Sequence, residues 1–316
     1  MNEPHRAMHT ARPHTGAAVS AGAVAAARHT ASRSLASRRL RPQVVARKVG
    51  FFVLLAIFVL ASLFPFYWIV ITSLKTNAQL AQGTSSLLPG HITWSNYSTD
   101  LTKEDFVRPL VNSAIVSLAA TVITVVLASL AGYAMSRTKI RGKPLIFGFV
   151  LIAAFFPIMA MVGPLFIVYR HIGLLNSYPG LTIACLIYTM PLATWLLTSY
   201  FSQIPVALEE AAIVDGATRL QALRKIIMPV ALPGVFTVTI LSFILVWNDF
   251  TFALSFMETP SKFTAPLAIV NLGQSQYQVF YNLIDAAVVI ISVPIALIVI
   301  FAQRRIVSGL TAGAVK

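Results

Sequence analysis

Two adjacent carboxylates, Glu209 and Glu210, lie within a polar segment that separates two long apolar stretches of the chain. The segment covers residues 202–234, and a connection of that length with internal order is expected to contact another molecule. Acidic residues and alanines suit an anionic membrane surface poorly, so we interpret it as a helix pair that docks on a cytoplasmic protein rather than as an amphipathic hairpin on lipid headgroups. Its candidate contact residues are Glu209, Glu210, Ala211, Ala212, Asp215, Gly216, Ala217, Ile226 and Pro229.

The residue types predict two short helices within this segment. Pro205 suits the first turn of a helix over 206–214, because its missing N–H is no loss there, and the two glutamates complement the helix dipole. Gly216 is placed as a left-handed stop after that helix. Thr218 and Gln221 then fit the Ser/Thr-x-x-Glu/Gln capping box of a second helix, which the following prolines bend toward the next apolar stretch.

The remaining reactive residue types predict no catalytic centre. The ten Asp and Glu residues are scattered along the chain, whereas an acid–base pair or a metal site needs them clustered. The single cysteine, Cys185, lies in an apolar stretch and is most simply a packing residue. The sequence lacks a Gly-x4-Gly-Lys-Ser/Thr phosphate loop, so ATP hydrolysis is not expected of this chain. We therefore predict no catalytic residue, no metal site and no cofactor bound by the chain itself.

The elements that carry these residues are predicted to be membrane helices. The chain has 316 residues, 57% hydrophobic and 11% charged, with a mean hydropathy of +0.78, whereas a soluble domain has about 25% charged residues. Six apolar windows each supply the roughly 20 residues that a helix needs to cross the hydrocarbon core. They cover residues 49–74, 111–135, 145–169, 181–201, 235–257 and 283–302. We predict an all-α integral membrane protein with six transmembrane helices.

The net charge of +14 follows from membrane topology. Basic residues gather on the side of the membrane that holds both termini, and the positive-inside rule makes that side the cytoplasm. The basic residues predicted on the opposite side are Lys75, Lys103, Arg108, Arg170 and Lys262. Because topology accounts for the charge, no nucleic acid partner is predicted.

Domain boundaries follow from the same pattern. Residues 1–48 carry few large apolar side chains, which is typical of a disordered basic cytoplasmic tail, with attraction to anionic lipid headgroups as the alternative. Residues 49–302 are predicted to form the six-helix domain, including the cytoplasmic loop 202–234. Residues 303–316 are predicted to form a cytoplasmic C-terminal tail.

The spacing of the polar segment matches a long signature, Glu-Ala-Ala-x3-Gly-x9-Ile-x-Leu-Pro. It is present as Glu210-Ala211-Ala212, Gly216, Ile226 and Pro229, with Met228 in place of leucine. In this pattern the chain resembles the permease subunits of binding-protein-dependent ABC importers. Over nearly everything after residue 49 it resembles the carbohydrate branch, maltose- and trehalose-type importers above all, through Asn112-Ser113, Gly132-Tyr133-Ala134 with Arg137, Trp247-Asn248-Asp249-Phe250 and the end of the chain.

The resemblance implies a type I ABC importer permease fold in a bacterial cytoplasmic (inner) membrane. It implies as partners a cytoplasmic ABC ATPase dimer, a second permease subunit, an extracytoplasmic solute-binding protein and membrane lipid. ATP and Mg²⁺ would bind on the ATPase. The substrate would be a disaccharide or oligosaccharide such as trehalose or maltose, with a glycerol phosphate as the less favoured candidate. Loop 202–234 would be the coupling joint, in which Glu210 pairs with a basic residue of the ATPase.

The sequence allows two interpretations of the residues that could line the transport pathway. Trp247, Asn248 and Asp249 are the candidates, because polar groups at membrane depth face a cavity or a neighbouring helix. Contact with a sugar hydroxyl and an interhelical hydrogen bond are equal alternatives for Asn248 and Asp249, and packing is the alternative for Trp247. An ion-coupled secondary transporter is the alternative function, although such carriers tend to have ionisable relays and inverted repeats. A membrane-bound transferase is a second one.

Overall fold

The computed structural model describes residues 42–312 except 83–86, 89, 103–104, 140 and 273–278, without the side chains of 42–45 and 304–312. The chain divides into two units, residues 1–64 and 65–316, and the packing described below lies within the second. Most of the tail predicted over 1–48 falls outside the described residues. The first helix, however, begins at Pro42, inside that predicted tail, and the last continues to Ala312, inside the predicted C-terminal tail 303–316.

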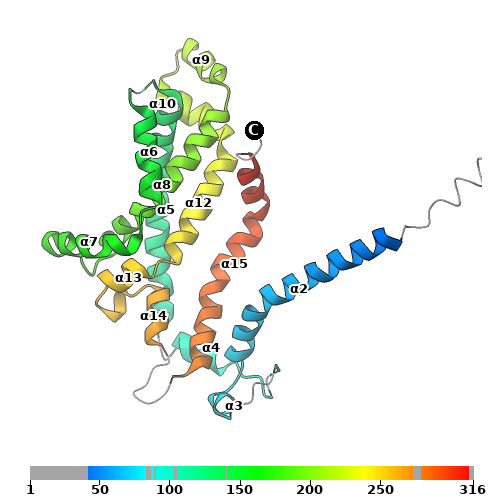
Figure 1. Ribbon diagram of the computed structural model, residues 1–316. Helices are drawn as coiled ribbons and strands as arrows, with labels where there is room; N and C mark the ends of the chain where they lie inside the picture. Colours follow the sequence, from blue (N-terminus) through cyan, green and yellow to red (C-terminus); the bar gives the residue numbers. More distant parts are fainter. Residues whose placement is uncertain are drawn as a thin grey trace, which may run out of the picture. The chain divides into compact units, whose positions relative to one another are not determined.

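Helices make up nearly all of the described chain (Figure 1). Four are long and apolar enough to cross a membrane, and two bent pairs bring the number to six if each pair is one span. The prediction of six transmembrane helices agrees with the higher number. The helices are α2 (Pro42–Ser73), α3 (Asn77–Ala81), α4 (Ser95–Thr102), α5 (Val107–Arg137), α6 (Lys143–Ala154), α7 (Ile158–Ile172), α8 (Tyr178–Gln203), α9 (Val206–Val214), α10 (Arg219–Ala222), α11 (Met228–Val230), α12 (Leu232–Trp247), α13 (Thr251–Phe256), α14 (Ala265–Asn271) and α15 (Tyr281–Ala312), with a π-helical turn at Leu223–Ile227 and a 3₁₀ turn at Pro260–Lys262.

The third and fifth predicted helices are broken, which corrects the straight spans expected over 145–169 and 235–257. α6 ends at Ala154, and α7 begins after Pro157 at an angle of 94°. Proline lacks the N–H of a continuing helix and forces the preceding residue toward an extended backbone, which explains the break. The second bent pair is Arg219–Val230 with Leu232–Trp247, at 82°, so its bend lies before α12. The fifth apolar stretch then ends its long helix at Trp247, and α13 follows as a separate short helix. A count of apolar residues gives the length of such a segment and not its direction.

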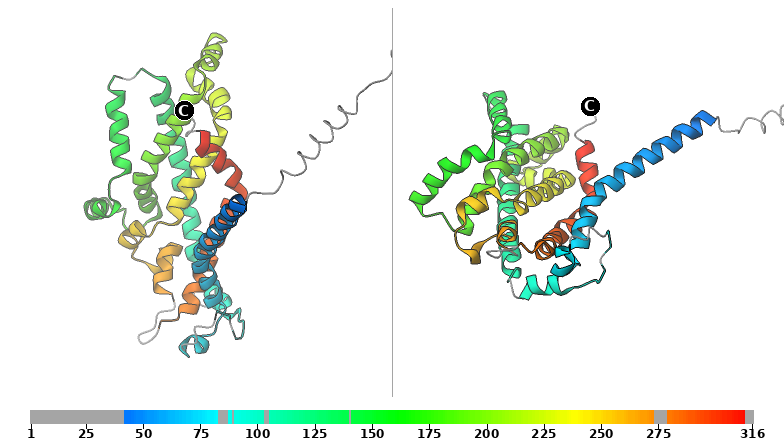
Figure 2. Two further views of the ribbon diagram at one scale, coloured as in Figure 1. Left: turned by 45° about the vertical axis from the view of Figure 1, so that its right-hand side comes forward. Right: turned by 60° about the horizontal axis from the view of Figure 1, so that its bottom comes forward.

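Three long helices, α5, α8 and α12, pack against one another in the centre of the second unit (Figure 2). Two glycines allow the closest approaches. A Cβ on Gly132 of α5 would lie 3.0 Å from the backbone nitrogen of Thr198 in α8, and one on Gly234 of α12 would lie 2.5 Å from the Tyr200 ring. Near these glycines, Leu197 and Phe201 of α8 are fully buried in an apolar cluster shared with α5 and α12. α8 is therefore held tightly between α5 and α12.

At the start of α5, Asn112 fastens the connection between α13 and α14 to the bundle. Its Nδ2 donates to the carbonyl oxygens of Ser261 at 3.1 Å and Phe263 at 2.9 Å, and its Oδ1 accepts from the Tyr178 hydroxyl at 2.8 Å. The neighbouring Ser113 Oγ accepts from the first backbone N–H of α14 at 2.8 Å. These bonds join segments that lie far apart in the sequence.

Asn176, just before α8, holds the same connection at a second point. Its Oδ1 accepts from the backbone N–H of Glu258 at 3.3 Å and of Thr259 at 3.2 Å, and its Nδ2 donates to Thr259 Oγ1 at 2.6 Å. Asn176 has a φ of +51°, a left-handed conformation that asparagine tolerates better than most residues. We refer to Asn112 and Asn176 as the amide tether.

Candidate functional site

The polar segment forms the short helices α9 and α10 at the end of the bundle opposite the start of α5 (Figure 1). Gly216, between them, has a φ of +87°, which confirms the predicted left-handed stop. Thr218 and Gln221 form the predicted capping box, with Thr218 Oγ1 accepting from the Gln221 N–H at 3.3 Å and Gln221 Oε1 accepting from the Thr218 N–H at 2.8 Å. Pro205 lies just before α9 rather than in its first turn. The predicted helix pair is confirmed.

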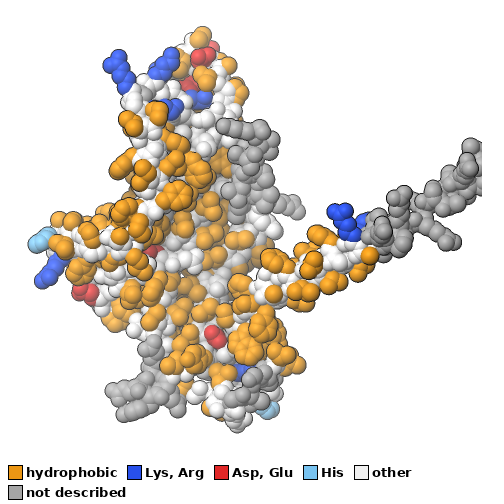
Figure 3. Space-filling view, viewed as in Figure 1, with side chains coloured by type: hydrophobic (Ala, Val, Ile, Leu, Met, Phe, Trp, Pro, Cys, Tyr) orange, Lys and Arg blue, Asp and Glu red, His pale blue; other side chains and the backbone are white. Residues whose placement is uncertain are grey.

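The outer face of α9 is apolar and exposed. Val206, Leu208, Ile213 and Val214 are 52%, 43%, 42% and 86% exposed, and Glu210 and Ala211 are also exposed. Charged side chains gather at this end of the molecule, whereas hydrophobic side chains cover much of the flank below it (Figure 3). Exposed apolar side chains grouped on a charged end are typical of a surface that contacts another molecule.

Glu209 and Ala212 face inward, which corrects the exposed contact surface that the sequence assigned to them. They are the buried residues of α9, whose nine positions are all described. Residues three apart lie on one face of a helix, whereas adjacent residues point in directions about 100° apart. The two neighbouring glutamates therefore have different surroundings: Glu209 is 6% exposed, and Glu210 is open to solvent.

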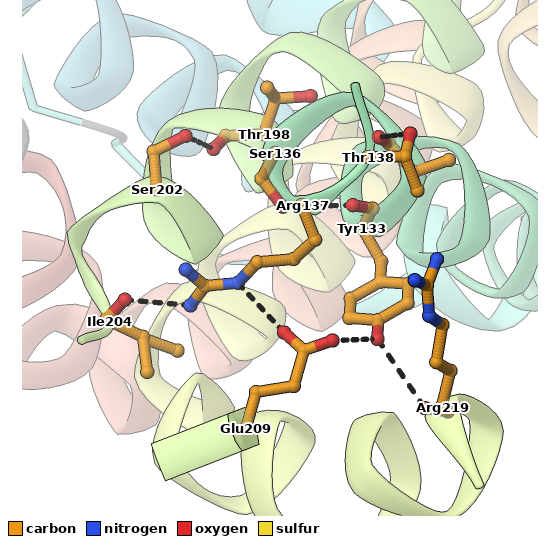
Figure 4. Close-up of polar contacts among 10 residues, drawn as sticks. Tyr133, Ser136, Arg137, Thr138, Thr198, Ser202, Ile204, Glu209 and Arg219 are labelled. Carbon is orange, nitrogen blue, oxygen red and sulfur yellow. Dashed lines mark hydrogen bonds and ion pairs between the residues drawn. The ribbon is translucent and has the colours of Figure 1, made fainter. Parts of the chain in front are cut away.

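Two side chains of α5 hold the Glu209 carboxylate (Figure 4). Glu209 Oε1 accepts a hydrogen bond from the Tyr133 hydroxyl at 2.5 Å, and Glu209 Oε2 lies 3.3 Å from Arg137 Nε. The Arg137 and Glu209 side chains are 5% and 8% exposed. We refer to Tyr133, Arg137 and Glu209 as the carboxylate clasp. Tyr133 and Arg137 can act together because residues four apart project from one face of a helix.

The clasp also reaches the linker before α9 and the helix after it. Arg137 Nη2 donates to the Ile204 carbonyl at 2.7 Å, in the linker between α8 and α9. The Tyr133 hydroxyl lies 3.4 Å from the Arg219 carbonyl of α10. Arg137 Nε and Glu209 Oε2 are not aligned for a hydrogen bond, so their contact is an ion pair. Because the pair is buried, loss of either member would leave an uncompensated charge.

A cleft of about 200 Å³ opens beside the clasp, between the end of α5 and α9. Both neighbouring glutamates border it. A basic side chain of another protein that entered the cleft would meet Glu210, because Glu209 is already paired with Arg137. The lining residues are Tyr133, Ser136, Arg137, Thr138, Val206, Glu209, Glu210, Ile213 and Arg219.

The remaining predicted contact residues shape the turn and the exit from the loop. Asp215 ends α9 and is exposed, and Ala217 is half-buried in the turn that follows. Beyond α10 the helix widens into the π-helical turn, whose last bond joins the Met228 N–H to the Leu223 carbonyl. This wider turn accommodates Pro229, whose ring would clash with the backbone of a regular α-helix. Pro229 is exposed and Ile226 is half-buried.

The three predicted pathway residues make contacts within the chain. Trp247 is 4% exposed, and its Nε1 donates to the Ile291 carbonyl of α15 at 3.2 Å, so its ring is part of the packing. Asp249 Oδ2 accepts from the Ala253 N–H at 3.1 Å and thereby caps α13. The Asn248 amide donates one turn back in its own helix at 2.7 Å, and its side chain is exposed. Of the three, Asn248 is the most exposed, and Asp249 is half-buried.

Comparison with known proteins points to one family. The family described as "Binding-protein-dependent transport system inner membrane component" matches residues 124–311. The trehalose transport system permease protein of Mycobacterium tuberculosis is 41% identical over 86% of this chain and 99% of its own length. The trehalose/maltose transport system permease protein of Thermococcus litoralis is 38% identical over 80% of this chain and 91% of its own length.

A solved structure shows the same fold. A chain of a bacterial ABC transporter involved in the import of the acidic polysaccharide alginate superposes with a TM-score of 0.72 and 26% identity. The match covers 85% of this chain and 99% of that chain. The helical architecture described above is thus that of a solved importer subunit.

Proposed function

The chain belongs to the family of binding-protein-dependent transport system inner membrane components, and from this premise we propose that it carries a sugar through its half of an ATP-driven pathway. As a family member it is the permease subunit of an ABC importer and crosses the inner membrane several times. ATP is hydrolysed by a separate ATPase subunit, and a second permease completes the membrane part. The fold agrees with ABC importer subunits and not with the ion-coupled transporter considered as an alternative.

The exposed face of α9 is the observation that carries the docking proposal. Its apolar side chains lie around Glu210, whose own side chain is exposed. We assign this face, with Ala211, Asp215 and the turn at Gly216, to the groove of the ATPase. Glu210 would pair there with a basic side chain, and the apolar neighbours would exclude water around that pair.

The orientation follows from charge. We place the α9–α10 end and both termini in the cytoplasm, because basic residues gather on that side. ATP and Mg²⁺ then bind on the ATPase, and this chain holds no cofactor of its own. The connection 258–282, whose residues 273–278 lie outside the described part, faces the solute-binding protein on the opposite side. The amide tether holds the part of this connection from Thr259 to Phe263, which supports a surface of fixed shape over those residues.

The proposed substrate is a disaccharide or short oligosaccharide, with trehalose or maltose as the first candidates. Two of the relatives, which belong to a trehalose and a trehalose/maltose transport system, support this class. Within the chain, Asn248 offers an exposed amide near the break between α12 and α13, where a sugar hydroxyl can exchange hydrogen bonds. Trp247 and Asp249 hold the backbone on either side of Asn248 in place, because they fix the end of α12 and the start of α13.

The proposal is tested by isolating the tagged chain in mild detergent and identifying its companions by mass spectrometry. An ATPase and a second, different permease are expected, and a solute-binding protein recovered with them can be screened with trehalose, maltose and glycerol 3-phosphate. Recovery of the chain alone, or only with copies of itself, would contradict the importer assignment.

The docking surface is tested by Glu210→Arg. This variant should insert and fold normally, because the side chain is exposed, but it should recover little ATPase and transport no sugar. Arg141→Glu reverses a charge at another exposed position of the same end and is the matched control. Normal sugar uptake by Glu210→Arg would contradict the assigned surface.

A further inference from the structure

The covalent link to α9 limits how far the helix can move but does not by itself fix its direction. α8 ends at Gln203, and α9 begins at Val206. The intervening Ile204 and Pro205 have extended backbones, with ψ of 128° and 130°. Two extended residues allow a nine-residue helix to pivot. Contacts of side chains with other elements must therefore define the orientation of α9.

α9 packs against α10 and the π-helical turn, and among the long helices its polar side-chain contacts reach α5 rather than α8, the helix that precedes α9 in sequence. Tyr133 and Arg137 of α5 both meet the Glu209 carboxylate, at 2.5 Å and 3.3 Å. Arg137 in addition bonds to the Ile204 carbonyl of the linker at 2.7 Å. One guanidinium thus contacts both the linker and the helix (Figure 4). Its side chain is only 5% exposed.

α5 and α8 form one body at this level. A Cβ on Gly132, adjacent to Tyr133, would lie 3.0 Å from the backbone of Thr198 and 3.1 Å from Leu197 Cβ, so the two helices touch almost backbone to backbone. Packed helices with such contacts move as rigid pieces and do not deform smoothly. A force applied to α9 is therefore transferred through the clasp to both helices.

We propose that Tyr133, Arg137 and Glu209 are positioning residues that lock the ATPase-docking helix α9 to the α5–α8 pair, so that a displacement of α9 becomes a displacement of the transport pathway. The proposal rests on the assigned function of α9 as the ATPase contact. It gives the two adjacent glutamates separate tasks: Glu210 contacts the partner, and Glu209 fixes the helix that presents Glu210. The clasp touches neither sugar nor nucleotide.

The position of α9 can be measured directly in the assembled importer in nanodiscs. Cys185 is the single cysteine of this chain, so in a Cys185→Ala background spin labels can be placed at Ala207→Cys, an exposed position of α9 outside the residues assigned to the ATPase contact, and at Leu130→Cys on α5, 47% exposed. We expect a narrow distance distribution with the clasp intact. Glu209→Gln and Arg137→Gln should broaden it, Arg137→Lys should lie between, and Arg141→Gln should leave it unchanged.

The functional consequence is measured as sugar molecules imported per ATP hydrolysed. The clasp variants should keep hydrolysing ATP while this ratio falls about tenfold, the size of a typical coupling between sites. The double exchange Arg137→Glu with Glu209→Arg should restore part of the ratio and narrow the distances again, which a general loss of packing would not produce.

Three results would overturn the proposal. The distance distribution of Glu209→Gln could match the parent, the ratio could stay unchanged although α9 has loosened, or ATP hydrolysis and uptake could fall in equal proportion. Failure of the proposed function would look different. In that case the parent importer itself would take up sugar without hydrolysing ATP, and the distance measurement on α9 would still report whether the clasp holds it.

Discussion

The two ends of α5 are both fastened by polar side chains, but with different chemistry. At its start the amide tether binds backbone groups of the connection between α13 and α14 through neutral amides. At its end the carboxylate clasp binds a single carboxylate of α9 through a buried cation and a phenol. Apart from the Asn176 bond to Thr259 Oγ1, the tether does not depend on which side chains the connection carries, whereas the clasp depends on one glutamate.

The difference indicates how each end can fail. Loss of an amide removes hydrogen bonds and leaves neutral carbonyls, a cost that is modest for each bond. Loss of either ion of the clasp leaves the other buried without compensation, which costs more than the pair itself contributes. The α9 end should therefore respond steeply and selectively to single substitutions, and the opposite end gradually.

Removal of the clasp cation should have the largest effect. Arg137→Ala leaves the Glu209 carboxylate buried, and breaking one side of such a pair costs about 3–5 kcal/mol. We expect a clear fall in the thermal midpoint of the purified chain in detergent, measured beside Arg141→Ala at an exposed position. Equal midpoints for the two variants would show that the pair contributes nothing to the fold.

Removal of an amide from the tether should rank second. Asn112→Ala deletes three hydrogen bonds at about 1 kcal/mol each. The effect should appear as faster proteolysis or hydrogen exchange of the connection 257–264, with α9 unaffected. Asn248→Ala, which loses one bond within its own helix, is the matched control. Increased exchange at α9 would contradict the separation of the two ends.

Removal of the clasp hydroxyl should rank third. Tyr133→Phe keeps the ring and the ion pair but deletes one hydrogen bond to a carboxylate, worth about 2 kcal/mol. We expect a smaller fall in the thermal midpoint than for Arg137→Ala and a partial loss of coupled uptake. If this variant were as damaging as Arg137→Ala, the hydroxyl and not the cation would be the dominant contact.

The smallest effect is expected for Ser113→Ala. It removes one hydrogen bond to the first N–H of α14, about 1 kcal/mol. Hydrogen exchange at the start of α14 should rise while the thermal midpoint hardly changes. A change larger than that of Asn112→Ala would show that Ser113, and not the amide tether, fastens the connection.

Local signals in the sequence were sufficient for the loop. Gly216 and the capping box of Thr218 with Gln221 depend on residues within one turn of each other, so their types predict their conformation. The sequence also contained a signal for the inward turn of Glu209, since two adjacent residues of a helix cannot face the same partner. Tyr133 and Arg137 are four residues apart, which places a hydroxyl and a cation on one face of α5. Their sequence spacing alone does not indicate that Glu209, more than 70 residues away, packs against that face.

Long-range features were beyond the sequence alone. The 94° break after α6 depends on Pro157 together with the packing of α7 on α13, and residue hydrophobicity does not encode that direction. Asn112 bonds to residues about 150 positions away, and its type gives no hint of which carbonyls it finds. The sequence left Trp247 and Asp249 open between pathway and packing roles, because a polar motif in an apolar stretch can line a cavity or end a helix.

The most direct test of the account compares Glu209→Gln with Glu210→Gln in the same reconstituted importer. ATPase retained on the membrane part and sugar imported per ATP would be measured for both. The account predicts that Glu210→Gln loses ATPase, whereas Glu209→Gln retains it and imports far less sugar for each ATP. If both variants lost the ATPase to the same extent, or if Glu209→Gln imported sugar normally, the division of tasks between the two glutamates would be wrong.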